Sequence, residues 1–388
     1  MQFDYIIKNG IVADFEKNTF SSKDIYVSGG RIVEGDGSLN AKNIVDAGGK
    51  YVLPGLIDLH AHYFYGGNNL GANADIVCPS QGITTGVDAG SAGTMNFDVF
   101  YRDGIMNMTT EVKAYISVSP EGVKAGFING EGSNPADIET NYAEILKMFR
   151  KYPDVIKGLK LRIAKETTEG YGLEPLKKTV ELANRIEAEG YRCIVAVHCG
   201  NLPEDAPIEG ILELLRKGDS YTHVYQNLGE KIFNGDRSIK KALIEARERG
   251  VLFETGNGSI HWTLQNLTDA FAQGFEPDII SSDIVLKLMW DKPSFGLLHC
   301  MNTALLCGMD ELSIFRAVTY SPAKAIEMLD EIGTLDVGTR ADIAIVDIMP
   351  SRQRFYDRFG GEKISEKVFV LLMTLREGQP VFRQTFFY

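Results

Sequence analysis

Short apolar segments alternate with amphipathic segments along residues 55–333, and this alternation limits the chain to few folds. Parallel strands joined by helices typically have this pattern. Two of the helical patterns are especially regular, at 176–189 and 239–249. The strand-like runs are 56–60, 83–88, 112–118, 155–162, 193–198, 220–225, 251–256 and 278–283.

Eight strand–helix units in about 280 residues predict an α/β fold, a TIM (β/α)8 barrel over residues 55–333. A doubly wound open sheet is the alternative. That fold binds nucleotides through a glycine-rich loop after its first strand, and no such loop follows 56–60.

Both ends of the chain consist of short strand-like runs separated by turn signals. The dipeptides Asn9-Gly10, Gly29-Gly30 and Gly48-Gly49 are typical of hairpin turns. The same pattern of strands returns after residue 334. We therefore predict one small β-sandwich domain formed from both termini, with residues 1–54 and 334–388 together.

Composition predicts a cytoplasmic protein. Hydrophobic residues make up 44% of the 388 residues, and the longest apolar runs, about eight to ten residues, are too short to cross a bilayer. The five cysteines have no CxxC spacing and are expected to be reduced. A net charge of −12 disfavours nucleic acid and anionic membranes as partners. The oligomeric state stays open, with a homo-oligomer among the options.

His60-Ala61-His62 lies at the end of the apolar run 52–59. Side chains two residues apart on a strand share a face, so both imidazoles point to the place where the strand ends. Neutral imidazole is a common ligand of zinc and related ions. The pair therefore predicts a metal site, and the alternative is two solvent-facing histidines beside a turn.

Other chemically active residues also fall at the ends of predicted barrel strands. In a TIM barrel the carboxyl ends of the strands converge on one mouth, where the active site lies. Four of the six histidines lie at such ends, whereas His261 and His299 do not, and we interpret these two as structural. The predicted ligands of two divalent metal ions are His60, His62, Lys160, His198, His223 and Asp283.

Lys160 is an unusual member of this set because a protonated amine would be repelled by two cations. Once carboxylated by CO2, its side chain presents two oxygens that can bridge both metals. The alternative is a solvated surface amine, but the preceding run 155–159 has the pattern of a buried strand. We therefore predict that Lys160 is carboxylated and bridges the two ions.

Several of these segments resemble the amidohydrolase superfamily, and the resemblance covers essentially the whole chain. It rests on the segments 53–62 and 333–343 and on Lys160, His198, His223 and Asp283. Within the superfamily, 158–162, 250–256 and 274–283 are similar to the dihydroorotase-related predicted amidohydrolase/deacetylase subgroup. This resemblance implies two zinc ions and a carboxylated lysine. The residues alone leave manganese, iron and cobalt open.

Three residues near the strand ends are predicted to contact the substrate. Arg162 lies on the same side of its strand as Lys160, where its guanidinium can hold a substrate carboxylate, although an ion pair within the barrel is the alternative. The subgroup is expected to carry Gly-His-Gly after the seventh strand, where this chain has Gly256-Asn257-Gly258. Gly256 and Asn257 are therefore assigned to the acyl pocket or to the leaving-group contact.

These expectations lead to a hydrolase of an amide or ester bond in a small anionic substrate. The resemblance implies a deacetylase of N-acetyl amino acids or O-acetyl hydroxy acids. A water held between two divalent ions ionises near neutral pH and can attack a carbonyl. Asp283 is expected to act as general base and then as general acid, and the alternative is a metal ligand that moves no proton.

Three other functions stay open at this level. One is the opening of a cyclic amide, as in dihydroorotases and hydantoinases, and the second is deamination of a purine. The third is a barrel that has lost catalysis and serves as an assembly protein. The presence of all six predicted ligands argues against the third, and Arg162 favours an anionic substrate over a purine.

Overall fold

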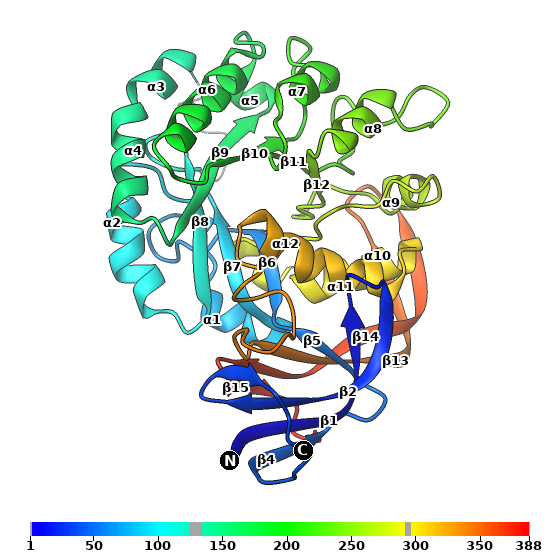
Figure 1. The fold of residues 1–388 in the computed structure, drawn as a ribbon. Coiled ribbons are helices and arrows are strands. Elements are labelled where there is room, and N and C mark those ends of the chain that lie inside the picture. Colours follow the sequence, from blue (N-terminus) through cyan, green and yellow to red (C-terminus); the bar gives the residue numbers. More distant parts are fainter. Residues whose placement is uncertain (1, 124–133, 292–295, 388) are drawn as a thin grey trace.

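The computed structural model describes residues 2–123, 134–291 and 296–387. In this part of the chain the strands form two sheets. Figure 1 shows one sheet curled into a barrel with helices around it, and the other sheet below it, where both termini lie. Pro54 ends the last N-terminal strand of the lower sheet, and Leu56 begins the first strand of the barrel. The domain boundaries themselves stay a prediction.

Seven parallel strands in sequential order form the barrel sheet in the described residues. Several are buried along their whole length, which explains why they appear in the sequence as continuous apolar runs. The strands are β6 (Leu56–Ala61), β7 (Ile83–Ala89), β8 (Glu111–Ser117), β9 (Ile156–Ile163), β10 (Ile194–Cys199), β11 (Ser220–Thr222) and β12 (Leu252–Glu254). These elements and their order confirm the predicted barrel.

The eighth predicted strand, 278–283, is not a regular strand but still closes the barrel. Ile279 forms a parallel bridge with Glu254 on one side, and Ile284 forms one with Ala61 on the other. Asp283 has a left-handed backbone with φ of 49°, which interrupts the extended ladder between these two bridges. The segment therefore fills the eighth position with few ladder hydrogen bonds.

Helices and short turns connect the barrel strands and surround them (Figure 1). The helical pattern at 176–189 is confirmed by α6, which has Pro175 in its first turn and ends before Gly190, whose φ is +92°. The pattern at 239–249 is confirmed by α8. The α-helices are α1 (Ala74–Val77), α2 (Phe97–Val99), α3 (Pro135–Thr140), α4 (Tyr142–Lys151), α5 (Lys165–Thr168), α6 (Glu174–Ala188), α7 (Ile208–Leu214), α8 (Lys241–Glu248), α9 (Leu264–Phe271), α10 (Leu297–Cys307), α11 (Glu311–Val318) and α12 (Tyr320–Ala325).

Three short 3-10 helices and one π-helix also lie in the segments that follow the barrel strands in the described residues. They are the 3-10 helices η1 (Pro79–Gln81), η3 (Ile105–Asn107) and η4 (Leu286–Met289) and the π-helical η2 (Phe100–Gly104). No helix among the described residues is both long and apolar enough to span a bilayer.

The second sheet contains strands from both ends of the chain, as predicted, joined by hydrogen bonds into one mixed sheet. Its order is β15-β14-β13-β5-β1-β2-β3, with β4 beside β1. Apolar side chains from several of these strands form a buried core of their own. The strands are β1 (Phe3–Asp14), β2 (Thr19–Ser28), β3 (Arg31–Val33), β4 (Ala41–Asp46), β5 (Tyr51–Pro54), β13 (Ile343–Tyr356), β14 (Glu362–Arg376) and β15 (Gln379–Arg383).

Two of the three predicted hairpin turns are wrong. Asn9-Gly10 lies inside β1, where the register against β2 shifts between Ile7 and Gly10 and Asn9 has φ of 59°. A left-handed residue within a strand produces a β-bulge, so the signal marks a bend in one long strand and not its end. Gly29-Gly30 does lie in a hairpin turn, between the antiparallel strands β2 and β3. Gly48-Gly49 lies in a turn between β4 and β5, but both of these strands run parallel to β1, so this turn does not form a hairpin.

A buried ion-pair group links the start of the barrel to the terminal sheet. Arg340 pairs with Glu111 of β8 and, at 2.8 Å, with Asp342, while Lys113 lies 2.7 Å from Glu111. Burial alone would raise the pKa of Glu111, but the two cations lower it to about 2. The charged form of Glu111 therefore stabilises the folded state.

Replacing Glu111 by Gln should lower the free energy of unfolding by about 3 kcal/mol at pH 7. Because the folded-state pKa lies below the ordinary value of 4.5, this contribution is complete above about pH 4.5 and is lost as the pH falls towards 2. Urea unfolding of both proteins between pH 7 and pH 2.5 measures it. A pH-independent difference would contradict the ion-pair explanation.

Candidate metal centre

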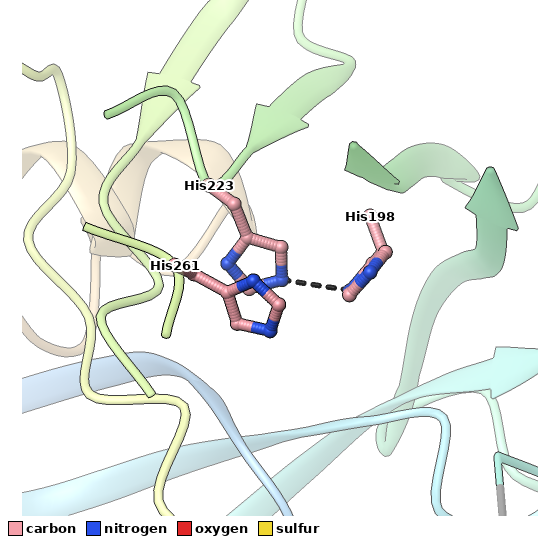
Figure 2. Close-up of side chains that lie close together, drawn as sticks. All are labelled: His198, His223 and His261. Atoms are coloured by element: carbon pink, nitrogen blue, oxygen red, sulfur yellow. Dashed lines mark hydrogen bonds between the residues drawn. The ribbon is translucent and has the colours of Figure 1, made fainter. Parts of the chain in front are cut away.

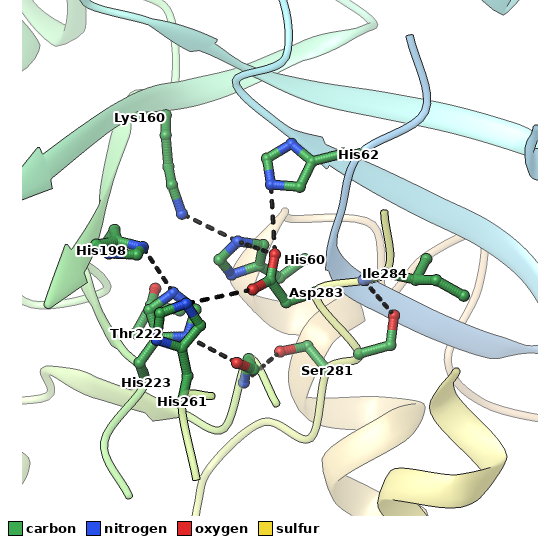
Figure 3. Close-up of polar contacts among 12 residues, drawn as sticks. His60, His62, Lys160, His198, Thr222, His223, His261, Ser281, Asp283 and Ile284 are labelled. Carbon is green, nitrogen blue, oxygen red and sulfur yellow. Dashed lines mark hydrogen bonds and ion pairs between the residues drawn. The ribbon is translucent and has the colours of Figure 1, made fainter. Parts of the chain in front are cut away.

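The six predicted ligand residues come together at the carboxyl ends of the barrel strands. All six are buried, and Figure 3 shows their polar ends facing one another. With the exception of His223, they line one cavity of about 200 Å3, and the Nε2 atom of His223 faces His198 from just behind its wall. The structure thus places in one cluster residues that are more than 200 positions apart in the sequence.

His60 near the end of β6 and His62 just beyond it direct their Nε2 atoms to the same carboxylate. Nε2 of His60 lies 3.5 Å from Oδ1 of Asp283, and Nε2 of His62 lies 3.3 Å from the same oxygen. The other ring nitrogens are also held: Nδ1 of His60 lies 3.0 Å from Glu254 and Nδ1 of His62 lies 2.8 Å from the Ser91 hydroxyl. Partners of this kind fix the tautomer of a metal-binding imidazole.

The Lys160 side chain, in β9, extends into the cluster and is only 2% exposed. Its Nζ atom lies 3.1 Å from Nε2 of His60. Burial lowers the pKa of Lys160 to about 8, although Glu254 and Asp283 act in the opposite direction. A fraction of the Lys160 side chains therefore carries a neutral amine near neutral pH, and the neutral amine is the form that reacts with CO2. Gly90 approaches the lysine closely, since a Cβ there would lie 2.7 Å from the Cβ of Lys160.

His198 at the end of β10 and His223 just beyond β11 form the other half of the cluster. Nε2 of His223 lies 2.8 Å from Nδ1 of His198, while Nδ1 of His223 faces the carbonyl oxygen of Gly256 at 2.7 Å. Burial, together with nearby positive groups, lowers the pKa values of both imidazoles well below 6.5. Both rings are therefore neutral at physiological pH, as metal ligands must be.

Asp283 comes from the irregular eighth segment and faces the histidines. Its backbone N–H donates to the carbonyl of His60 at 2.7 Å, and the carbonyl of Ile284 accepts from the N–H of His62 at 3.0 Å. Burial would raise the pKa of Asp283, but His60, His62 and His261 lower it overall. Both Asp283 and His223 have positive φ, and strained backbone of this kind is concentrated at functional sites.

This donor set fits divalent metal ions. One ligand atom each from His60, His223 and Asp283 lies within 4.8 Å of the others, and the same holds for His198, His223 and His261. The donors are imidazole nitrogens and a carboxylate oxygen, which suit zinc and related ions. Nε2 of His223 and Nδ1 of His198 form a hydrogen bond at 2.8 Å, so both ring nitrogens point into the same space.

The interpretation of His261 as a structural histidine away from the mouth is wrong. His261 lines the cavity, and its Nε2 atom lies 4.0 Å from Oδ2 of Asp283. Figure 2 shows its ring against that of His223, with centroids 4.0 Å apart and planes 22° apart. Because nearly parallel rings have nearly parallel in-plane lone pairs, one ring must turn before both can bind one ion. His299 lies outside the cavity lining of the described residues, beside Phe355.

The turn after β12 explains why His261 reaches the mouth. Gly256 and Gly258 have φ of 46° and 49°, so the backbone folds back over the strand end. A Cβ on Gly258 would lie 2.6 Å from Oδ2 of Asp283. The sequence signal for this turn is the glycine pair Gly256 and Gly258, whereas the prediction assigned Gly256 and Asn257 to substrate contacts and did not place His261.

Of the three residues predicted to contact the substrate, one lines the cavity and two do not. Arg162 in β9 lines the cavity, whereas the cavity wall after β12 consists of residues 258–261. Gly256 lies behind this wall and accepts the His223 hydrogen bond. Asn257 is 3% exposed, and its side-chain oxygen is buried with no hydrogen-bond partner among the described residues. The assignment of Gly256, Asn257 and Arg162 to the substrate stays a prediction.

Apolar side chains form another part of the cavity wall, in addition to the charged and polar residues. They are Leu70, Val123, Ile260, Val285 and Leu288. A concave site with convergent polar groups and a partly apolar wall is the usual form of a small-molecule site.

Comparison with known proteins identifies the family. The family model for the amidohydrolase family matches residues 51–373. The chain belongs to the amidohydrolase family, and it is a hydrolytic enzyme that acts on carbon–nitrogen bonds. A deacetylase from Agrobacterium fabrum is 29% identical over 354 residues, which are 90% of this chain and 84% of that protein.

Two solved structures are similar over the whole chain. An adenine deaminase has a TM-score of 0.87 at 26% identity and covers 98% of this chain and 100% of its own. A dihydroorotase has a TM-score of 0.86 at 26% identity and covers 98% of this chain and 99% of its own. The barrel with a terminal sheet is therefore shared by hydrolases of different substrates.

Replacing Gly258 by Ala should weaken metal binding about tenfold or more, because the new Cβ would displace Asp283 from its contacts with the histidines. Metal per chain, measured by mass spectrometry after dialysis at graded chelator concentrations, tests this. Gly274→Ala is the matched control, since Gly274 also has positive φ but has no atoms within 4 Å of its Cβ position. Equal metal retention in both variants would show that the turn does not hold Asp283 in place.

Proposed function

We propose that this protein is a metal-dependent deacetylase that uses two divalent ions, zinc in the first instance, on a small carboxylated substrate. The observation that carries the proposal is the convergence of His60, His62 and Asp283 on one side, and His198 and His223 on the other, with Lys160 between them. This arrangement provides nitrogen and oxygen donors for two adjacent ions. The deacetylase from Agrobacterium fabrum supports the choice of reaction.

The ions, when bound, would polarise the substrate carbonyl and activate a water for attack. The chain supplies the cage that positions them. His60 and His62 would bind one ion and His198 and His223 the other, with Lys160 bridging as a carbamate. The lowered pKa of Lys160, about 8, supports carboxylation because CO2 reacts with the neutral amine.

Asp283 would carry the proton. Its carboxylate lies within 3.5 Å of both His60 and His62 and borders the cavity, and its lowered pKa keeps it ionised at neutral pH. It can accept a proton at Oδ1 or Oδ2 from the attacking water and return it to the leaving nitrogen or oxygen. His261, beside the other oxygen of Asp283, would limit where that leaving group lies.

The cavity supports a small substrate with one anionic group. Arg162 supplies the positive charge in the wall, and its planar guanidinium is suited to a carboxylate. Leu70, Val285 and Leu288 provide apolar contact for the remaining part of the substrate. N-acetyl amino acids and O-acetyl hydroxy acids combine these features. Cyclic amide opening is the second candidate and purine deamination the third, supported by the similarity to a dihydroorotase and to an adenine deaminase.

Replacing Asp283 by Asn should lower kcat by about 10²–10⁴-fold, because the amide can still face the ions but cannot accept a proton. Turnover and metal content are measured on the same preparation with added metal. A variant that keeps both metal and most of its turnover would show that Asp283 is a ligand without a role in proton transfer.

A substrate panel tests the proposal directly. Protein prepared with zinc and bicarbonate is assayed against N-acetyl amino acids of both configurations, O-acetyl hydroxy acids, dihydroorotate, hydantoins and adenine. We expect turnover of the acetylated compounds and about two metals per chain. Turnover confined to the ring compounds would replace the proposal by a cyclic amidohydrolase or a deaminase, and protein that binds no divalent metal would overturn the mechanism.

A further inference from the structure

A buried carboxylate that the metal cluster does not need as a ligand lies directly behind His60. Glu254 is the last residue of β12 and is 1% exposed. Its Oε1 atom lies 3.0 Å from Nδ1 of His60 and accepts from the Ser281 hydroxyl at 2.6 Å. Its Oε2 atom accepts from the hydroxyls of Ser220 at 2.9 Å and Thr222 at 3.1 Å. Each oxygen thus has two partners.

All of these partners can act as donors, so the site is built for the ionised carboxylate, which only accepts. The Ser281 hydroxyl itself accepts from the N–H of Gly256 at 3.0 Å, which directs its own hydrogen to Glu254. The partners come from β6, β11 and the eighth segment. A buried charge held by four partners is stable where an unpaired one would be costly.

The contact with Glu254 decides which nitrogen of His60 carries the hydrogen. A carboxylate beside Nδ1 keeps the hydrogen there and leaves the lone pair of Nε2 directed at Lys160 and Asp283, at 3.1 and 3.5 Å. The corresponding partners of His62 and His223 are uncharged, a serine hydroxyl and a backbone carbonyl. Among these three rings His60 is therefore the one oriented by a full negative charge.

We propose that Glu254 is a positioning residue of the metal centre, which fixes the His60 tautomer and supplies a buried negative charge that strengthens metal binding without contacting the ions. This inference rests on the proposed metal-dependent function. Asp283 and a carboxylated Lys160 offset only part of the charge that two divalent ions bring, and Glu254 offsets more of it from behind the ligand. Removing its charge should therefore speed the loss of metal.

The test is the rate of metal release to excess chelator from the zinc-loaded Glu254→Gln protein. The amide keeps the size of the side chain and an oxygen for His60 but removes the charge. We expect release about 10- to 100-fold faster than from the wild type. The cobalt-substituted variant should also show a shifted visible absorption spectrum, because the His60 nitrogen becomes a weaker donor.

Glu111→Gln is the matched control, because it also removes a carboxylate from a buried ion-pair group, but at the other end of the barrel. It should destabilise the fold and leave the release rate and the cobalt spectrum unchanged. Ser220→Ala removes one hydrogen-bond donor to Glu254 and keeps the negative charge of Glu254, so it should speed metal release by only about two- to fivefold. If Glu254→Gln does not fold, the release rate of Ser220→Ala tests the inference. Release from Glu254→Gln no faster than from Glu111→Gln, or from Ser220→Ala no faster than from the wild type, would overturn the inference.

The outcomes separate this inference from the proposed function. Wild-type protein that binds metal but hydrolyses no acetylated compound would refute the deacetylase proposal, and fast release from Glu254→Gln would still support the role of Glu254. Conversely, deacetylase activity with unchanged release from the variant would refute only the role of Glu254. A wild type that binds no divalent metal would overturn both.

Discussion

The closure of the barrel between β6 and the eighth segment is the constraint on which the site depends. The hydrogen bond from the Asp283 N–H to the His60 carbonyl and the one from the His62 N–H to the Ile284 carbonyl join the first and last barrel positions. They place the carboxylate of Asp283 beside the imidazoles of His60 and His62. Because a closed parallel sheet directs all its carboxyl ends to one mouth, the other predicted ligands then lie close to Asp283 and the two histidines.

Burial of so many polar groups is costly unless each has a partner, and the barrel interior supplies these partners in layers. Asp58, below His60, accepts from the backbone N–H and the hydroxyl of Ser282. Asp88 accepts from the N–H groups of Tyr63 and Ser91, and Ser91 in turn contacts His62. Ser91, in the loop after β7, therefore orients a histidine. The predicted ligands are thus held by neighbouring polar groups within the barrel.

Periodicity made much of the fold predictable from the sequence. Continuous apolar runs marked β6 to β10, and the helical spacing of apolar residues marked α6 and α8. The eighth strand was predicted at the right place but with too regular a structure, because the left-handed backbone at Asp283 has no signature in hydrophobic pattern. The prediction of a hairpin turn at Asn9-Gly10 was wrong for a related reason. The same dipeptide allows positive φ in a turn and in a β-bulge.

The sequence by itself determined the strand order of the barrel, the two-part terminal sheet and the six residues that the structure gathers at the mouth. Strand-end position is a local property, and the barrel converts it into proximity. Only the tertiary structure decided that His261 joins the cavity, that Gly256 and Asn257 lie behind its wall, and that Glu254 contacts His60. Those contacts depend on the backbone angles of one turn and on the alignment of strands distant in the sequence, which local pattern does not specify.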